Sequence, residues 1–374
     1  MKPLHVEICD VTLRDGEQTP GVSFTCEEKQ EIAHKLDAVG IDVIEAGFPI
    51  VSPYEKKCVS CIARMGLEAR ICCLARARPG DVEVAIDCDV DMISVFIATS
   101  DLHIRHKYRK PRDQVFSEAL DMIDLARDHG LRVRFAAEDA SRTDINLLKE
   151  LYRSGEQRGA DLLSFADTVG CLVPTEMYAI MSDLVACVSR PLCAHCHNDM
   201  GLATANTITA AEAGAFQLHT TVNGIGERAG NAALEEVLVA LRMKAGIDRY
   251  DLTHLTELSA MVERFSGITL QKTKPVVGAH AFSHESGIHI AAILEDPQTY
   301  EFFFPEMVGG QRRFILGKHT GKTALEHIVA TLGYHLNDQQ ICTILDEVKE
   351  LGESKIGITP EALTALIRHV RKEK

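Results

Sequence analysis

Short apolar segments rich in β-branched residues alternate with longer amphipathic segments over most of the chain. Apolar runs bounded by turn residues are typical of buried strands, whereas apolar positions spaced three and four apart predict helices. Eight strands are predicted, at residues 5–13, 42–48, 68–75, 91–98, 132–139, 161–168, 191–198 and 216–223. Strands that alternate with helices of ~10–15 residues indicate βα units, and eight such units favour a (β/α)8 TIM barrel. The predicted fold class is therefore α/β, with a barrel that ends near residue 250.

The ends of several predicted helices carry recognisable signals. Thr25 and Glu28 have the spacing of a capping box, and Gly40 is placed to end the helix that follows. The same reasoning predicts helices over 112–129 and 144–158, each followed directly by a glycine. These signals support the alternation of helices with strands.

The last third of the chain has a different character. Residues 251–275 are predicted to be helical, 276–323 are glycine-rich and irregular, and helices are predicted near 324–332, 337–351 and 360–372. We therefore expect a catalytic barrel at 1–255, a linker helix and lid subdomain at 256–323, and a helical C-terminal subdomain at 324–374.

Charge and composition narrow the class of protein. The formal net charge is −14, whereas nucleic-acid binders and proteins of anionic membranes carry a basic excess. No apolar run approaches the ~18 residues of a membrane helix, and the N-terminus lacks the apolar core of a signal peptide. Twelve cysteines without a secretory signal are expected to be reduced thiols. The sequence predicts a cytoplasmic enzyme with no nucleic-acid or membrane partner.

Polar residues gather where the predicted strands end. Active sites of TIM barrels lie at the C-terminal ends of the strands, so polar residues there are candidates for function. They include Arg14, Asp15, Gln18, Glu45, Arg76, Glu138, Thr168, His195, His197 and Asn231. Any one of them could be an ordinary capping or ion-paired residue. Polar residues at the ends of six strands together favour a functional site.

His195 and His197 form the sharpest motif. Residues two apart on a strand face the same side, so both imidazoles can point into the barrel mouth. Two histidines and a carboxylate suit a divalent metal that must also hold a substrate. Closure of the barrel brings the end of the first strand near the seventh, which makes Asp15 the expected carboxylate and Asn231 a neighbouring ligand. The alternative is a pair of hydrogen-bonded histidines.

A glycine-rich loop follows the last predicted strand, where barrels often bind phosphate. Its backbone amides at Gly224 and Gly226, with the Arg228 side chain, could hold an anionic cofactor; a tight turn is an equally good interpretation. In the irregular tail, His284, His289 and Tyr300 could belong to a lid that carries a general acid or base.

Nine motifs together resemble the isopropylmalate/homocitrate synthase family, which comprises acyltransferases with a TIM-barrel metallolyase fold. They are DVTLRDGEQ (10–18), EAGFP (45–49), FIATS (96–100), AEDASRT (137–143), ADTVG (166–170), HCHNDMG (195–201), NGIGERAGN (223–231), HESGIH (284–289) and LGKHTG (316–321). The resemblance implies a Claisen condensation of acetyl-CoA with a 2-oxo acid, followed by thioester hydrolysis. It also implies a divalent ion (Mn²⁺, Mg²⁺ or Zn²⁺) at Asp15, His195 and His197, with Asn231 nearby.

The resemblance further implies roles for the remaining candidates. Arg14 would stabilise the developing alkoxide, while Gln18, Glu45 and Thr168 would contact the substrate, Thr168 at its C1 carboxylate.

Proton transfer to and from the acetyl methyl would fall to Glu138 with His289 and Tyr300, and His284 is the competing choice for the base.

The segments EAGFPIVS (45–52), TPGVSF (19–24) and SDLH (100–103) look most like the archaeal homocitrate synthases. Those enzymes extend 2-oxoglutarate, and some extend its longer homologues, toward coenzyme B. The distal carboxylate of such a substrate needs a cation, for which Arg76, Arg78, His103 and Arg105 are the candidates in this sequence.

Isopropylmalate or citramalate synthase is the alternative within the family. Outside it, a metal-dependent retro-aldol lyase would share the barrel and its metal site but lack the tail, and a non-catalytic paralogue would be expected to lose Arg14, Asp15 or a histidine. Family members are usually homodimers, so the C-terminal region is expected to contribute to the site of the partner subunit.

Overall fold

The computed structural model describes residues 4–372. They form two compact units, and the chain passes from the first to the second between Leu270 and Gln271. In the part of the chain that the structure describes, no helix has the length and apolar character needed to cross a membrane.

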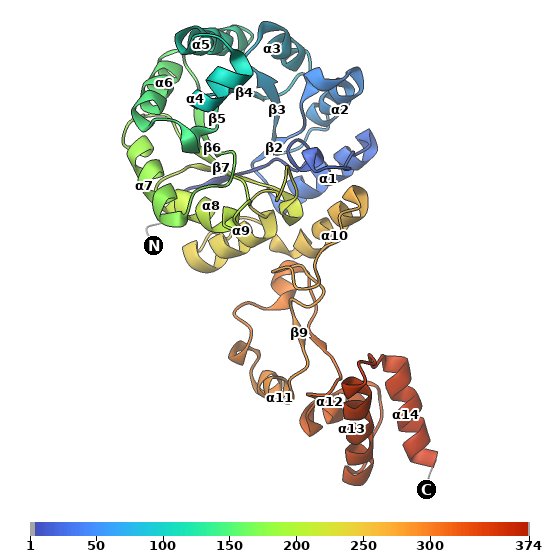
Figure 1. Cartoon of the computed structure of the whole chain (residues 1–374). Helices are drawn as coiled ribbons and strands as arrows, with labels where there is room; N and C mark the ends of the chain where they lie inside the picture. Colours follow the sequence, from blue (N-terminus) through green and yellow to red (C-terminus); the bar gives the residue numbers. More distant parts are fainter. Residues whose placement is uncertain (1–3, 373–374) are drawn as a thin grey trace. The chain divides into compact units, whose positions relative to one another are not determined.

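The first unit is a closed barrel of eight parallel strands in the order β1 to β8, which confirms the predicted fold class (Figure 1). The strands are β1 (Glu7–Asp10), β2 (Val43–Glu45), β3 (Arg70–Arg76), β4 (Met92–Ala98), β5 (Arg132–Glu138), β6 (Leu162–Asp167), β7 (Leu192–Cys196) and β8 (Gln217–Thr220). Closure is made by β1 and β8, where Cys9 is paired with His219.

Helices surround the strands (Figure 1). They are α1 (Cys26–Val39), α2 (Pro53–Ala63), α3 (Pro79–Ile86), α4 (Asp101–His103), α5 (Arg112–Asp128), α6 (Ile145–Gln157), α7 (Pro174–Val185), α8 (Ala203–Glu212), α9 (Leu234–Ala240) and α10 (Leu255–Ser266). The predicted capping box is present at α1: the Thr25 hydroxyl accepts from the Glu28 amide, and the Glu28 carboxylate accepts from the Thr25 amide. Gly40 ends the helix in the left-handed conformation, which glycine adopts at low cost.

The observed strands are shorter than the predicted ones, and the first shows the reason. Residues 5–13 are predicted to be a strand, but the ladder ends at Asp10. The carbonyl of Val11 accepts from the amides of Arg14, Asp15 and Gly16 and so closes a tight turn. This turn carries the polar residues that follow β1 into the barrel mouth.

Apolar side chains fill part of the barrel interior. Cys9, Val43, Cys72, Met92 and Leu162 are fully buried there. Burial raises the pKa of the Cys9 thiol to about 12, so this thiol is neutral at physiological pH. All twelve cysteines are free, as expected for reduced thiols.

Helix α10 belongs to the first unit. The sequence places residues from 256 onward in a linker, but α10 packs against α1 and against the loop that follows β8. Asn223 of that loop donates to the Ser259 carbonyl at 2.9 Å and accepts from the Ser259 hydroxyl. These buried contacts make the helix part of the barrel.

Among the described residues, the second unit contains a two-stranded parallel sheet and four α-helices (Figure 1). Its elements are β9 (Ser283–His284), α11 (Gly287–Glu295), β10 (Arg313–Phe314), α12 (Lys322–Thr331), α13 (Asp338–Glu353) and α14 (Pro360–Lys372). The last three helices match the predicted ones, and they share an apolar core that includes Leu325, Val329, Ile344, Leu363 and Ile367.

Lys29 on α1 is fully buried and joins the turn that follows β1 to the first turn of α2. Its ammonium lies 2.6 Å from Glu17 and 2.7 Å from Glu55. Burial would lower the pKa of Lys29, but the two carboxylates outweigh burial and raise the pKa. The lysine is therefore charged at neutral pH, and its removal would leave two carboxylates unpaired.

We predict that Lys29→Met lowers the free energy of unfolding by about 3 kcal/mol at pH 7, because a buried ion pair is broken from one side. Urea unfolding of the full chain, followed by circular dichroism, measures the change. Lys110→Met is the control, since the Lys110–Glu118 pair is nearly half exposed and its loss should cost at most about 0.5 kcal/mol. Equal effects of the two substitutions would contradict the structural role given to Lys29.

Candidate metal centre and active-site cavity

A cavity of about 320 Å³ opens at the C-terminal ends of the barrel strands. Its charged and hydroxyl-bearing lining residues are Arg14, Asp15, Glu45, Ser94, Lys107, Arg134, Glu138, Ser164, Thr168, Glu227 and Arg228. Gln18, His195, His197 and His219 also line it, together with apolar residues such as Phe48, Leu74 and Phe96. Most of the site residues predicted within the barrel thus meet in one cavity.

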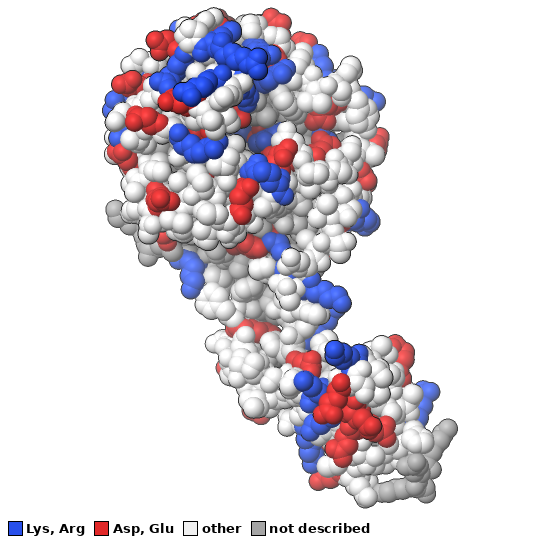
Figure 2. All heavy atoms as spheres, in the orientation of Figure 1, with Lys and Arg blue, Asp and Glu red and all other residues white. Residues whose placement is uncertain are grey.

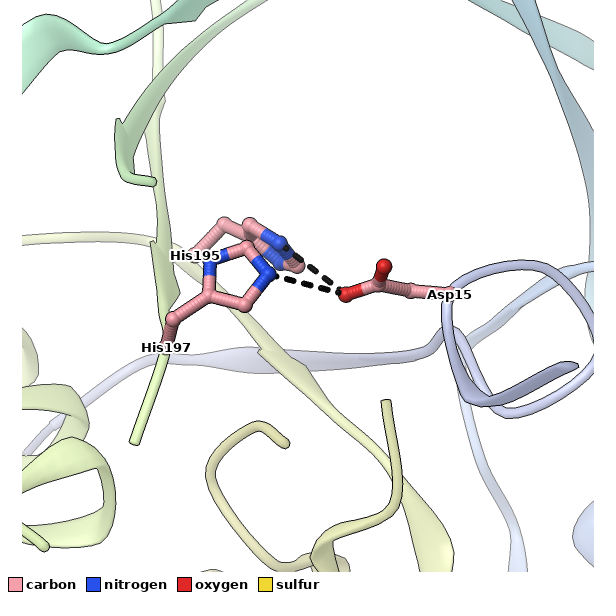
Figure 3. Close-up of side chains that lie close together, drawn as sticks. All are labelled: Asp15, His195 and His197. Carbon is pink, nitrogen blue, oxygen red and sulfur yellow. Dashed lines mark ion pairs between the residues drawn. The ribbon is translucent and has the colours of Figure 1, made fainter. Parts of the chain in front are cut away.

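Asp15, His195 and His197 converge in this cavity, and all three are buried (Figure 3). The Asp15 Oδ2 atom lies 3.4 Å from His195 Nε2 and 3.3 Å from His197 Nε2. The histidines come from the end of β7 and from the residue just beyond it, and both point to the same side, as the two-residue spacing predicts. Asp15 comes from the turn that follows β1.

The protonation states of the cluster suit a metal ion. Burial would raise the pKa of Asp15, but Arg14 and the hydrogen bonds from the two imidazoles outweigh burial and hold the pKa well below its ordinary value. Burial lowers the pKa of His195 to about 4, against the opposing effect of the Asp15 carboxylate. At neutral pH the cluster therefore offers an ionised carboxylate and a neutral imidazole, the forms that bind metals.

Asn231 lies beside the cluster. Its Nδ2 donates to Asp15 Oδ2 at 2.7 Å and to the Ile225 carbonyl at 3.2 Å. Its Oδ1 is buried and has no hydrogen-bond partner among the described residues. Two imidazoles, one carboxylate and a spare amide oxygen are a donor set that fits a divalent ion with open positions.

The glycine-rich loop after β8 supports Asn231. A Cβ atom at Gly226 would collide with the Asn231 amide nitrogen, and one at Gly230 would collide with the Gly224 carbonyl. Arg228 donates to both Asp199 carboxylate oxygens, at 2.7 and 2.9 Å, and to the Thr168 carbonyl. The loop is thus packed against itself and its neighbours, and its one arginine is paired with an acid of this chain.

A chain of alternating charges runs below the cluster. Arg134 on β5 is 1% exposed and donates to Glu45 Oε2 at 2.7 Å. Glu45 Oε1 accepts from Arg14 Nε at 3.1 Å, and Arg14 in turn lies 3.2 Å from Asp15. Glu45, a predicted substrate ligand, is therefore engaged by two arginines, although it lines the cavity.

Glu138 is the last residue of β5, and Thr168 directly follows β6. Glu138 Oε2 lies 2.5 Å from Lys107, which follows β4, and its Oε1 lies 3.8 Å from His103 Nδ1. The Thr168 hydroxyl accepts from the Asp139 amide at 2.8 Å. Both residues line the cavity.

Two predicted substrate ligands lie outside the described lining of the cavity. Arg76 donates to both carboxylate oxygens of Asp81, at 2.7 and 3.0 Å, so its charge is already paired. His103 is held in the first turn after β4, where its amide donates to the Ser100 hydroxyl. The cations that do line the cavity on this side are Lys107 and Arg134.

Arg134, His219 and Lys107 are site residues that the sequence analysis did not identify. Arg134 has a detectable signal, since it lies four residues before Glu138 on the same predicted strand and hence on the same face. His219 lies in the eighth predicted strand and accepts from Arg134 at 3.1 Å. Lys107 lies in a π-helical turn, Ile104–Tyr108, which the sequence pattern does not announce.

The three predicted tail residues belong to the second unit. His289 stacks on Tyr300, with ring centroids 3.9 Å apart and an angle of 24° between the rings. His284 Nε2 lies 3.5 Å from Glu301, and burial lowers the pKa of His284. Glu301 also binds Arg312 through both carboxylate oxygens.

Two family models match the chain. The model described as HMGL-like matches residues 5–262, and the model described as homocitrate synthase post-HMGL domain-like matches residues 276–356. The matched ranges correspond closely to the barrel unit and to most of the second unit.

Individual relatives agree with these models. The chain is 55% identical to "Homocitrate synthase AksA" of Methanosarcina acetivorans, over 100% of this chain and 93% of the relative. It is 46% identical to "(R)-citramalate synthase CimA" of Methanocaldococcus jannaschii, over 98% of this chain and 75% of that one. Among solved structures, the HMG-CoA lyase of Bacillus subtilis matches with a TM-score of 0.65 at 22% identity, over 72% of this chain and 96% of the lyase, which shows a shared fold.

We predict that the protein binds one Mn²⁺ ion per chain and that Asp15→Ala abolishes this binding, because the central ligand is lost. Asn231→Ala should weaken binding by about 10- to 100-fold, since the residue orients Asp15. Isothermal titration with Mn²⁺ after removal of metal by a chelator measures both effects. His254→Ala, outside the cavity lining, should bind Mn²⁺ as the unaltered chain does, and undiminished binding by Asp15→Ala would contradict the assigned site.

Proposed function

We propose a function from one premise: this chain belongs to the HMGL-like family, and its second unit carries the homocitrate synthase post-HMGL domain. It is an acyltransferase with the activity of a homocitrate synthase. Acetyl-CoA, 2-oxoglutarate and water are converted into (R)-homocitrate and CoA, and longer 2-oxo diacids are further substrates. The observation that carries the proposal is the buried Asp15–His195–His197 cluster inside a cavity of a chain 55% identical to a homocitrate synthase.

A divalent ion, which could be Mn²⁺, Mg²⁺ or Zn²⁺, would be held by Asp15, His195 and His197 and would supply Lewis acidity toward the carboxylate and keto oxygen of the 2-oxo acid. Arg14, beside Asp15, is placed to stabilise the alkoxide that forms at the attacked carbonyl. Burial would lower the pKa of Arg14, but Glu45 and Asp15 raise it, so its charge is retained throughout. Gln18 and Thr168, which line the same cavity, contact the substrate, Thr168 at its C1 carboxylate.

We assign the removal of a proton from the acetyl methyl group to Glu138. Its carboxylate faces the cavity and is held by Lys107 at 2.5 Å, so it has a fixed position from which to accept the proton. The methyl group of a thioester is a weak carbon acid, which explains the need for a base close to it in a site that excludes water.

Charge balance supports a dicarboxylic substrate. Four cations line the cavity (Arg14, Lys107, Arg134, Arg228), as do four carboxylates (Asp15, Glu45, Glu138, Glu227). The bound divalent ion would add two positive charges, which a 2-oxo dicarboxylate would neutralise and a monocarboxylate would not.

The position of the cations supports the same choice. In the closed barrel, Lys107 follows β4, across from β8 and β1, whereas the Arg134 guanidinium extends from β5 to Cys9 of β1 and His219 of β8 at the floor of the cavity. A diacid chelated at one end would extend its distal carboxylate toward these cations and toward Ser94, which Arg134 contacts at 3.1 Å. Because Arg134 and Lys107 line the cavity and Arg76 does not, we assign the distal carboxylate to Arg134 and Lys107.

The surface around the mouth suits anionic substrates. Five of the ten residues from His103 to Arg112 are Lys or Arg, and none is acidic. Figure 2 shows basic side chains gathered over α4 and the start of α5 on this face of the barrel. A basic rim on an acidic protein raises the local concentration of anions such as acetyl-CoA and 2-oxo acids.

We further propose a homodimer in which the second unit serves the barrel of the partner subunit, through His289 and Tyr300, with His284 as the alternative base. Large apolar side chains stand exposed on this unit, among them Ile288 at 78% and Phe302 at 64%. Exposed apolar surface of this kind is typical of a surface that is covered in the assembly. We expect this assembly in the cytoplasm, where the twelve free cysteines stay reduced.

We predict that CoA release with Mn²⁺ or Mg²⁺ is at least about tenfold more efficient with 2-oxoglutarate or 2-oxoadipate than with 2-oxoisovalerate or pyruvate. Thiol detection of CoA in parallel assays measures kcat/KM for each acid. Arg134→Met should reduce the preference for the dicarboxylates. A preference for 2-oxoisovalerate or pyruvate would identify an isopropylmalate or citramalate synthase instead.

The shared site predicts complementation between two inactive variants. A heterodimer of a His195→Ala chain and a Tyr300→Phe chain would contain one intact site, so we expect roughly half of the unaltered activity. The two chains, carrying different affinity tags, are co-expressed and purified through both tags before assay. An inactive heterodimer would show that each chain uses its own tail.

A further inference from the structure

Lys107 has two partners to serve at the mouth of the barrel. Its ammonium lies 2.5 Å from Glu138 Oε2, which belongs to the carboxylate that we assign to proton removal. The proposed function also gives Lys107 the distal carboxylate of the 2-oxo diacid. Lys107 and Glu138 line the same cavity, so a substrate carboxylate that enters it competes with Glu138 for one ammonium group.

The ion pair occupies the proposed base. Among the described residues, Lys107 is the only one whose side chain donates a hydrogen bond to the Glu138 carboxylate. The next candidate is His103, whose Nδ1 lies 3.8 Å from Glu138 Oε1 and makes no hydrogen bond with the described residues. A carboxylate oxygen that accepts from an ammonium is not open to a proton from carbon. While this pair is intact, Lys107 therefore holds the base in position and also withholds it.

Lys107 can change partner without movement of the backbone. Its side chain is 42% exposed, and it lies in the π-helical turn Ile104–Tyr108, which buried Ile104 anchors to the barrel. The Lys107 ammonium lies 5.5 Å from the centre of the Phe96 ring and 5.9 Å from that of Tyr108. Aromatic faces attract a cation without fixing its position, and lysine has a flexible four-carbon stem. The ammonium is thus free to shift along the cavity wall.

We propose that binding of a 2-oxo diacid draws Lys107 away from Glu138 and so makes the base available. The inference rests on the proposed function and describes how its two substrates are coupled. Once the distal carboxylate holds the ammonium, Glu138 accepts a proton from the acetyl methyl group. The C–H bond breaks, its electron pair passes into the thioester as an enolate, and the enolate carbon attacks the keto carbon already in place. Lys107 acts on the methyl group only through Glu138, as a positioning residue.

This arrangement also selects the substrate. A monocarboxylic 2-oxo acid offers Lys107 no second carboxylate, so the pair with Glu138 persists and the methyl group keeps its protons. Arg134, the other cation assigned to the distal carboxylate, cannot replace Lys107 in this role, because it is buried and donates to Glu45 at 2.7 Å. Selection for a diacid therefore acts on proton removal as well as on binding.

Hydrogen exchange at the acetyl methyl group tests the proposal. Acetyl-CoA with a trideuterated acetyl group is incubated in water with the Mn²⁺-loaded protein, and mass spectrometry follows the loss of deuterium. 2-Hydroxyglutarate is the probe, since it has both carboxylates but no keto carbon with which to condense. We expect it to accelerate the exchange about tenfold or more, and 2-hydroxyisovalerate, with one carboxylate, to change the rate by less than about twofold.

Substitution of the lysine should uncouple the exchange from the diacid. We expect Lys107→Met to exchange without any acid as fast as the unaltered protein does with 2-hydroxyglutarate, a gain that general damage to the site would not produce. KM for 2-oxoglutarate should rise about tenfold, because the distal carboxylate loses a partner. Lys107→Gln, at the same exposed position, should behave alike, and Glu138→Gln should not exchange under any condition. Lys110→Met is the matched control, since Lys110 lies in the same basic segment but outside the cavity lining, and it should behave as the unaltered chain.

Five results would overturn the proposal. They are exchange in the unaltered protein that needs no acid, no exchange in it even with 2-hydroxyglutarate, equal acceleration by 2-hydroxyisovalerate, continued dependence on 2-hydroxyglutarate in both Lys107 variants, and an unchanged KM for 2-oxoglutarate. Failure of the proposed function is distinguishable, because the unaltered protein would then release no CoA with any 2-oxo acid.

Discussion

The buried guanidinium of Arg134, at the floor of the cavity, determines how the other charged groups of the site are arranged. If its charge were unpaired, Arg134 would destabilise the barrel by roughly several kcal/mol. Glu45 must therefore stay ionised and close to Arg134. Glu45 is shared with Arg14, and Arg14 lies against Asp15, which faces the two imidazoles. Four charges of alternating sign thus connect the floor to the mouth, and displacement of any member would leave the next one unpaired.

The parts of the site that follow from local periodicity could be predicted from sequence. Period two along a strand places His195 and His197 on one side, and the barrel rule places polar strand ends at the mouth. The fold follows from the same regularities, because eight βα units and signals such as the Thr25–Glu28 capping box agree. Element ends were less predictable, since a turn such as that after Asp10 depends on where backbone amides find acceptors.

Pairings between distant loops could not be predicted, because the sequence shows which charges exist but not which partner each one reaches. Arg228 resembles an anion ligand until Asp199, 29 residues away, is seen to bind it. Pairings at short range escape notice too: Arg76 resembles a substrate ligand until Asp81, only five residues further along the chain, is seen beside it. Arg134 was missed because its strand is recognised by apolar residues. The stacking of His289 on Tyr300 arises from an irregular segment that has no period to analyse.

The preassembled Asp15–His195–His197 cluster has a consequence for how the protein acquires its ion. Because one carboxylate oxygen already lies within 3.4 Å of both ring nitrogens, an incoming ion finds its ligands in place and little backbone has to move. Small, open donor sets of this kind follow the general affinity order of divalent metals and do not enforce a choice of their own. On the proposed assignment, the ion that would occupy the site is set by the divalent ions available in the cell, and the activity of the protein would vary with that supply.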